Sequence, residues 1–126
     1  MKRAVRWLDA AGAWGLLLFG CLHNFVGAPH LFHAISDSLF WFVSAGLALW
    51  YSGAVNLVRQ SARSRFAVWT AVPVNLTLLA FVTAFGLHSG AIARPDGLLL
   101  VAIAAIETIF SLVHAFSPDS PRTQSA

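Results

Sequence analysis

The 126-residue sequence contains few charges, with Lys, Arg, Asp and Glu making up only 10% of it. An ordinary soluble domain has roughly 25%. Four long apolar runs separate the charge clusters, at about residues 7–27, 39–58, 66–87 and 97–116. Each run reaches the ~20 residues that a helix needs to cross the hydrocarbon layer. A soluble globular protein is thereby excluded, and the sequence predicts an integral membrane protein.

Cysteine is almost absent. Cys21 is the single cysteine, so no intrachain disulfide forms. The sequence also lacks a nucleophile–base pair, a zinc-type motif and the cysteine pattern that attaches haem covalently. These absences argue against a serine, cysteine or metal hydrolase. We therefore favour a protein that is not an enzyme.

Basic residues are distributed unevenly along the chain. The net charge of +3 might suggest a nucleic-acid partner, but seven of the eight basic residues flank the runs on alternate sides. These are Lys2, Arg3, Arg6, Arg59, Arg63, Arg65 and Arg122. Only Arg94 lies in the other two loops. This is the asymmetry of the positive-inside rule, which predicts cytoplasmic termini, a cytoplasmic 59–65 loop and no nucleic-acid partner.

The expected fold is an all-α membrane protein, a four-helix transmembrane bundle of up-down-up-down topology. Residues 1–116 form its single domain, in the cell membrane, and the basic start of the chain precedes an uncleaved first span. We expect Gly27 and Pro29 to end the first helix. Residues 117–126 are polar and rich in Ser and Pro, which predicts a disordered tail.

Glu107 is the chemical anomaly, because it lies near the middle of the fourth run. A charged side chain there costs roughly 2.5–3.5 kcal/mol, so such residues face the bundle interior. We interpret Asp9 as an interface charge and assign Arg59 to a loop, which leaves no Lys or Arg in the body of any span. Without a counter-charge, burial favours the neutral form of a carboxyl group. We therefore predict a protonated Glu107 that donates a hydrogen bond.

Several polar residues are candidate neighbours of Glu107. Helical spacing places Ser111 and His114 on its own face, toward the cytoplasm. Asn75 and Thr77 lie at similar depth in the third run, about 200° apart around the helix axis, so only one of them faces the bundle centre. Two interpretations remain open. The cluster either holds the helices in register, or handles a proton or cation along Ser111 and His114.

Four histidines fall at the predicted outer surface: His23, His30, His33 and His88. Imidazoles bind transition metals, and a pair such as His23 and His88 is suited to axial ligation of haem. Histidine is also common at the membrane interface as an amphipathic residue. We favour the interfacial role and keep metal and haem as alternatives, with the cofactor left unknown.

Three classes of function follow from these observations. The leading one is a non-enzymatic binder of a hydrophobic small molecule or lipid, or an accessory subunit of a larger membrane partner. The second is a proton-coupled transporter or channel that uses Glu107, as a homo-oligomer because four short helices enclose little lumen. The third is a haem- or metal-binding redox protein that uses the outer histidines.

Overall fold

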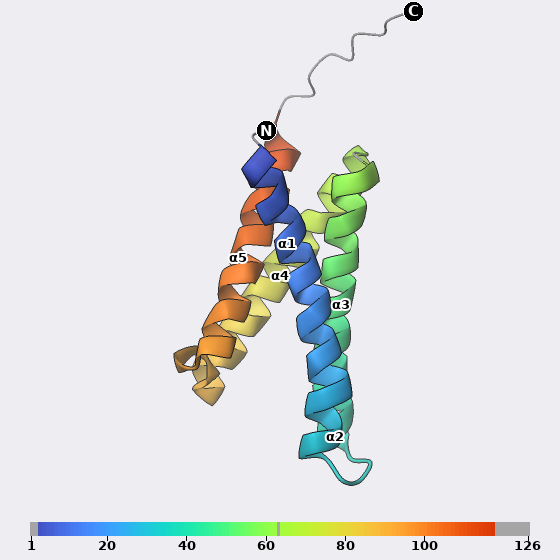
Figure 1. The fold of residues 1–126 in the computed structure, drawn as a ribbon, viewed down its shortest axis with the longest axis vertical. Helices are drawn as coiled ribbons and strands as arrows, with labels where there is room; N and C mark the ends of the chain where they lie inside the picture. The colour runs from blue at the N-terminus through green and yellow to red at the C-terminus, as the bar shows by residue number, and fades with distance from the viewer. Residues whose placement is uncertain (1–2, 63, 118–126) are drawn as a thin grey trace, which may run out of the picture.

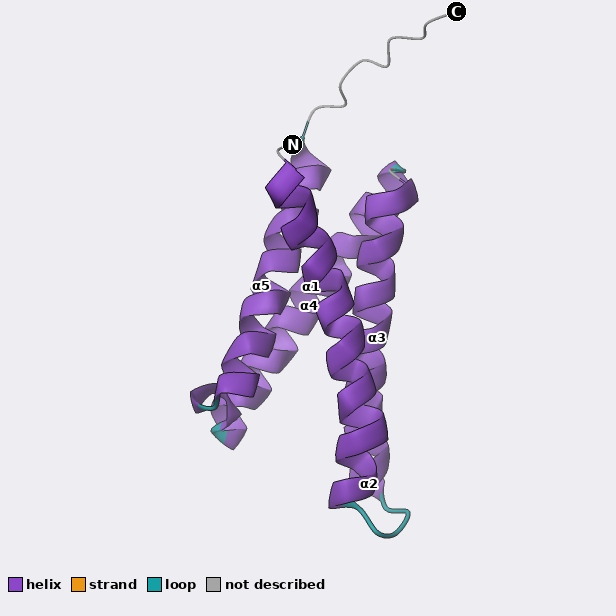
Figure 2. Ribbon diagram, in the orientation of Figure 1, coloured by secondary structure: helices purple, strands orange, loops and turns teal. Residues whose placement is uncertain are grey.

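The computed structural model describes residues 3–62 and 64–117. Helices and short connections account for all of these residues. The elements in chain order are α1 (Arg3–Cys21), the π-helical turn η1 (Leu22–Gly27), α2 (Ala28–Leu31), α3 (Asp37–Ala62), α4 (Arg65–Ser89), the 3₁₀ turn η2 (Ala91–Ala93) and α5 (Pro95–Phe116). Figure 2 shows how little of the described chain lies outside helices. The predicted tail at 117–126 falls outside the described residues, apart from Ser117.

Four helical segments are long and apolar enough to cross a membrane: Arg3–Leu31, Asp37–Ala62, Arg65–Ser89 and Pro95–Phe116. The prediction of an all-helical fold with four helices long and apolar enough to span a membrane is therefore confirmed for the described residues. The helices extend beyond the apolar runs, because backbone hydrogen bonding continues after the side chains become polar. The second helix reaches Ala62. Most of the predicted 59–65 loop is consequently helical, and the connection between the second and third long helices is shorter than predicted.

The first span also continues further than expected. Gly27 and Pro29 do not end it, because the helix continues through the π-helical turn η1 into α2. The N–H of Ala28 donates to the carbonyl of His23, five residues earlier. Pro29 has no N–H to donate, so its position just after the wide turn leaves no donor unsatisfied.

Successive long helices run in opposite directions, and the start of α1 lies near the end of α5 (Figure 1). We call this the terminal end, and the end that carries α2 and η2 the loop end. The most extensive contacts join α1 to α3 and α4 to α5. These two pairs diverge toward the loop end (Figure 1).

An apolar core lies between the helices, on the loop side of the buried polar residues. Its buried members are Leu16, Leu49, Leu78, Val82 and Ala104. Each long helix therefore contributes an apolar segment nearer the loop end and a polar segment nearer the terminal end. The polar segments converge on the candidate site described below.

Close contact between α1 and α3 depends on glycine. A Cβ at Gly53 would lie 2.8 Å from the carbonyl oxygen of Ala13 and 3.1 Å from the backbone N of Leu17. Small residues permit such backbone approach in membranes, where lipid supplies no hydrophobic drive for helix association. Trp50 adds a hydrogen bond between these helices, since its indole N–H donates to the carbonyl of Leu17 at 3.1 Å.

We predict that Gly53→Ala lowers the free energy of unfolding by roughly 1–3 kcal/mol, the usual cost of overpacking. Gly15→Ala is the matched control, because its Cβ would meet only the flexible end of Ile103 at 3.2 Å. Reversible unfolding in mixed micelles measures both variants. Equal losses for the two would contradict a rigid backbone contact at Gly53.

Candidate functional site

Glu107 of α5 is completely buried and has a cationic partner. Its Oε2 accepts a hydrogen bond from Nη2 of Arg59 at 3.0 Å, and both side chains have 0% exposure. The expectation that Glu107 lacks a counter-charge was therefore wrong. The error follows from the helix boundary, because Arg59 belongs to α3 and not to a loop.

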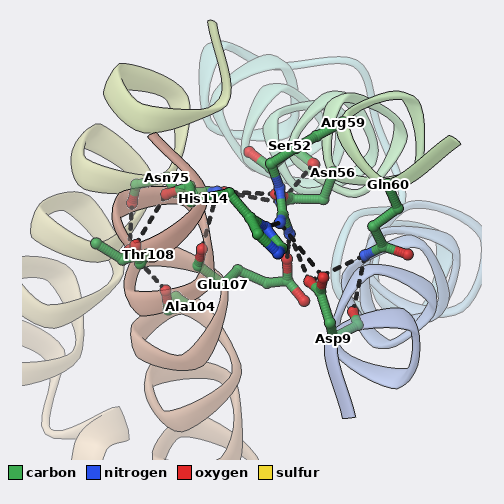
Figure 3. Close-up of polar contacts among 11 residues, drawn as sticks. Asp9, Ser52, Asn56, Arg59, Gln60, Asn75, Ala104, Glu107, Thr108 and His114 are labelled. Carbon is green, nitrogen blue, oxygen red and sulfur yellow. Dashed lines mark hydrogen bonds and ion pairs between the residues drawn. The ribbon is translucent and has the colours of Figure 1, made fainter. Parts of the chain in front are cut away.

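Arg59 is the centre of the cluster, as Figure 3 shows. Nη2 also contacts Oδ1 of Asp9 at 2.5 Å, and Nη1 donates to Oδ2 of Asp9 at 3.3 Å. Nε donates to Oδ1 of Asn56 at 3.1 Å. All three guanidinium nitrogens thus have acceptors, as a buried charge requires. We call Asp9, Arg59 and Glu107 the charge cluster.

Asp9 is not the interface charge that its place near the chain start suggested. It is only 2% exposed. Besides Arg59, Gln60 donates from Nε2 to both Oδ1 and the backbone carbonyl of Asp9, each at 3.0 Å. Asp9 therefore binds α1 to α3 through two side chains of the same helical turn.

His114 lies beside Arg59, with its Nδ1 2.5 Å from Nη1 of the guanidinium. A guanidinium has donors only, so Nδ1 accepts and carries no proton. This contact assigns His114 as a neutral imidazole with its proton on Nε2. The side chain is part-buried, and it lies in the last turn of α5, at the terminal end of the bundle.

An amide pair links the charge cluster to α4. Nδ2 of Asn56 donates to Oδ1 of Asn75 at 2.8 Å, and Nδ2 of Asn75 donates back to Oδ1 of Asn56 at 2.9 Å. The second N–H of Asn75 reaches the backbone carbonyl of Glu107 at 3.2 Å. Thr108 completes this contact by donating to the carbonyl of Asn75 at 3.2 Å. The polar network consequently joins all four long helices.

Of the other residues predicted near Glu107, Asn75 and Ser111 are buried, whereas Thr77 is exposed. Thr77 is exposed on the outside of α4 and donates to its own helix at Pro73, 2.8 Å away. Asn75 is thus the one of that pair that faces the centre. Ser111 is fully buried, but its hydroxyl donates to the carbonyl of Thr108 at 2.8 Å.

The outer histidines form no metal-binding group of three or more ligating side chains within the described residues. Nε2 of His23 lies 2.9 Å from the carbonyl of Phe42, and the two rings stack with centroids 3.7 Å apart. His30, His33 and His88 are exposed. Across residues 3–62 and 64–117, no group of three or more His, Cys, Asp or Glu side chains is arranged to hold a metal ion. This geometry gives the metal and haem alternatives no support.

Sequence reasoning missed Asp9, Asn56, Arg59 and Gln60 as members of the site. A signal for two of them was present, because Asn56 and Arg59 follow Ser52 at +4 and +7 and therefore share a helix face with it. Asp9 carried no comparable signal, since its partner lies fifty residues away.

No protein-family model, curated protein or solved structure matches the chain.

We predict that Arg59→Gln destabilises the fold by roughly 3–5 kcal/mol, because it leaves two buried carboxyl groups without their cation. Thermal or denaturant unfolding of the purified protein measures the loss. The control is Arg94→Gln. Arg94 forms an exposed ion pair with Asp96, with 68% and 56% of the two side chains accessible, and this pairing raises the pKa of Arg94. Solvent screens such a pair, so the control should unfold like wild type. Similar behaviour of both variants would contradict a central role for Arg59.

Proposed function

We propose that the chain is a multi-pass protein of the cell membrane that binds an apolar small molecule or lipid in a groove between α3 and α4. The proposal includes an up-down-up-down bundle with both termini in the cytoplasm. The observation that carries it is a groove of about 330 Å³, a size within the range of small-molecule sites. Its lining residues are Ala48, Tyr51, Ser52, Val74, Thr77, Leu78 and Phe81.

The hydroxyl groups of this groove indicate what it binds. Tyr51 lies near the middle of α3 and is 67% exposed. Within the described residues, neither its hydroxyl nor that of the neighbouring Ser52 forms a hydrogen bond. Lipid tails offer such groups no partner, and an unpaired hydroxyl in an apolar medium is costly.

An apolar molecule with a hydrogen-bond acceptor at mid-depth fits these features. The apolar walls would take its hydrocarbon part, and Tyr51 and Ser52 would donate to the acceptor. A quinone carbonyl or the carbonyl of a deeply placed lipid has this chemistry. A phospholipid headgroup fits less well, because it lies at the membrane surface and not near the middle of α3.

The polar network supports ligand binding better than conduction through one chain. It runs from His114 at the terminal end to Glu107 and Asn75, and the apolar core of Leu16 and Leu49 follows on the loop side. A proton or ion crossing the bundle would have to pass this core. The charge cluster instead supplies a firm base from which the two helix pairs diverge, and the groove lies on the loop side of that base.

Basic residues support the proposed orientation, although Arg59 no longer counts because it is buried. In the sequence, six of the other seven basic residues precede or open the first apolar run, separate the second run from the third, or follow the fourth. Arg94 alone follows η2 at the loop end. The asymmetry therefore survives the removal of Arg59 and supports the proposal of a cytoplasmic terminal end.

We predict that Ala48→Trp abolishes binding, because the indole would fill the groove. Ala54→Trp is the matched control, since Ala54 is also an exposed alanine of α3 but does not line the groove. Photo-crosslinking in proteoliposomes with a quinone probe that carries a diazirine reads out binding. Tyr51→Phe keeps the ring and removes one hydrogen bond worth about 0.5–1.5 kcal/mol, so the probe's affinity should fall about two- to twelvefold.

Three outcomes would contradict this site. The first is equal labelling of the Ala48→Trp and Ala54→Trp variants by the probe. The second is a set of crosslinks that maps away from α3 and α4. The third is a dimer formed through this face, which disulfide trapping at Ala48→Cys would detect.

A second prediction concerns orientation. In a Cys21→Ser background, Ala34→Cys and Ala93→Cys should react with a membrane-impermeant maleimide on intact cells, because both lie at the loop end. Ala62→Cys should react only after the membrane is permeabilised. All three are exposed alanines, so intrinsic accessibility is matched. The reverse labelling pattern would overturn the proposed topology.

A further inference from the structure

The buried charges of the cluster do not balance. Arg59 contributes one positive charge, whereas ionised Asp9 and Glu107 contribute two negative charges. His114 is neutral, because its Nδ1 accepts from Arg59. The other side chains that contact the cluster are Asn56 and Gln60 of α3 and Asn75 of α4, all uncharged. With both acids ionised, the cluster therefore has one uncompensated negative charge in the bundle interior.

One carboxylate oxygen is also left without a partner. Oε1 of Glu107 is buried and makes no hydrogen bond of good geometry with any described residue, although the backbone N–H of Ala13 lies near the carboxyl group. Both oxygens of Asp9, in contrast, accept from Arg59, and Oδ1 accepts from Gln60 as well. Leaving a buried charged acceptor unpaired carries its full desolvation cost. The excess charge and the unpaired atom thus point to the same oxygen.

The space around Oε1 decides between a proton and a metal cation. Oε1 packs directly against α1 at Gly12, so closely that a Cβ on this glycine would collide with it. A sodium or calcium ion needs several oxygen ligands around it. Within the described residues, no group of three or more His, Cys, Asp or Glu side chains is arranged to supply such a shell, whereas a proton needs none.

We propose that the charge cluster binds one exchangeable proton, carried on Oε1 of Glu107. The proton comes from water at the terminal end, where His114 is part-exposed, and its addition converts the carboxylate to a carboxylic acid. Oε2 keeps its hydrogen bond from Arg59, and Asp9 stays ionised with all of its donors. The loaded cluster then has no net charge, which is the state that burial in an apolar bundle favours.

Isotope-edited infrared spectroscopy tests this proposal on the wild-type protein. Glu107 is the only glutamate in the sequence, so ¹³C-glutamate labels one side chain. In liposomes at neutral pH, we expect a carboxylic-acid C=O band that shifts with the label. A label-sensitive signal confined to the carboxylate stretches would show an ionised Glu107 and overturn the proposal.

Variants test whether the charge count is the cause. Asp9→Asn removes one negative charge, so Glu107 and Arg59 then balance and the labelled acid band should disappear. Asp96→Asn is the control, since Asp96 lies in the exposed pair with Arg94, and it should leave the band unchanged. Persistence of the band in Asp9→Asn would mean that burial alone keeps Glu107 neutral, which would contradict the shared-charge proposal.

Asp9→Glu keeps both negative charges and gives a second test that does not depend on whether Asp9→Asn folds. The cluster then contains two labelled glutamates, and the proposal predicts one acid and one carboxylate in the labelled spectrum. Two acids or two carboxylates would overturn it. The result does not depend on the groove between α3 and α4, so this proposal and the proposed function fail separately.

Discussion

The guanidinium of Arg59 is the contact on which the other buried polar groups depend. It holds Asp9 of α1 and Glu107 of α5 at once, and through Asn56 it positions the amide pair with Asn75 of α4. Buried ion pairs are a weak source of net stability, because desolvating the charges costs nearly as much as their attraction returns. Their larger effect here is geometric. Only one arrangement of the four helices satisfies these donors and acceptors together, so the terminal end of the bundle has a defined register.

The two ends of the bundle consequently differ in character. At the terminal end, directional hydrogen bonds join every long helix. At the loop end, His23 contacts the carbonyl of Phe42 within the first helix pair, but no comparable network joins the two pairs among the described residues, and the pairs diverge (Figure 1). Packing between apolar helices in lipid is weakly specific, since lipid tails compete for the same surfaces. A rigid base combined with divergent pairs is an arrangement in which a groove accommodates a guest without loss of the fold.

Apolar runs were sufficient to predict four spanning helices, because the thickness of the hydrocarbon layer sets their length. Hydropathy indicates where side chains become polar and not where helical hydrogen bonding stops. The apolar run at 39–58 therefore predicts a second helix that ends before Arg59, whereas α3 continues to Ala62. That boundary error removed the only buried Lys or Arg among the described residues and led to the prediction of an unpaired Glu107. Helical spacing correctly allowed just one of Asn75 and Thr77 to face the centre. It did not identify which one, because a single helix carries no information about the faces its neighbours present. The partnership of Asp9 with Arg59 was likewise beyond reach, since no local pattern connects residues on different helices.

The order in which the chain is made gives the charge cluster a further consequence. A ribosome delivers α1 and α3 to the membrane before α5 exists. Asp9 and Arg59 form a balanced pair at that stage, so the first hairpin enters the bilayer without a net internal charge. Glu107 enters the membrane last, when the guanidinium of Arg59 is already paired with Asp9. Insertion of the final helix is therefore the step that brings in the surplus charge, and biogenesis of the protein should be most sensitive there.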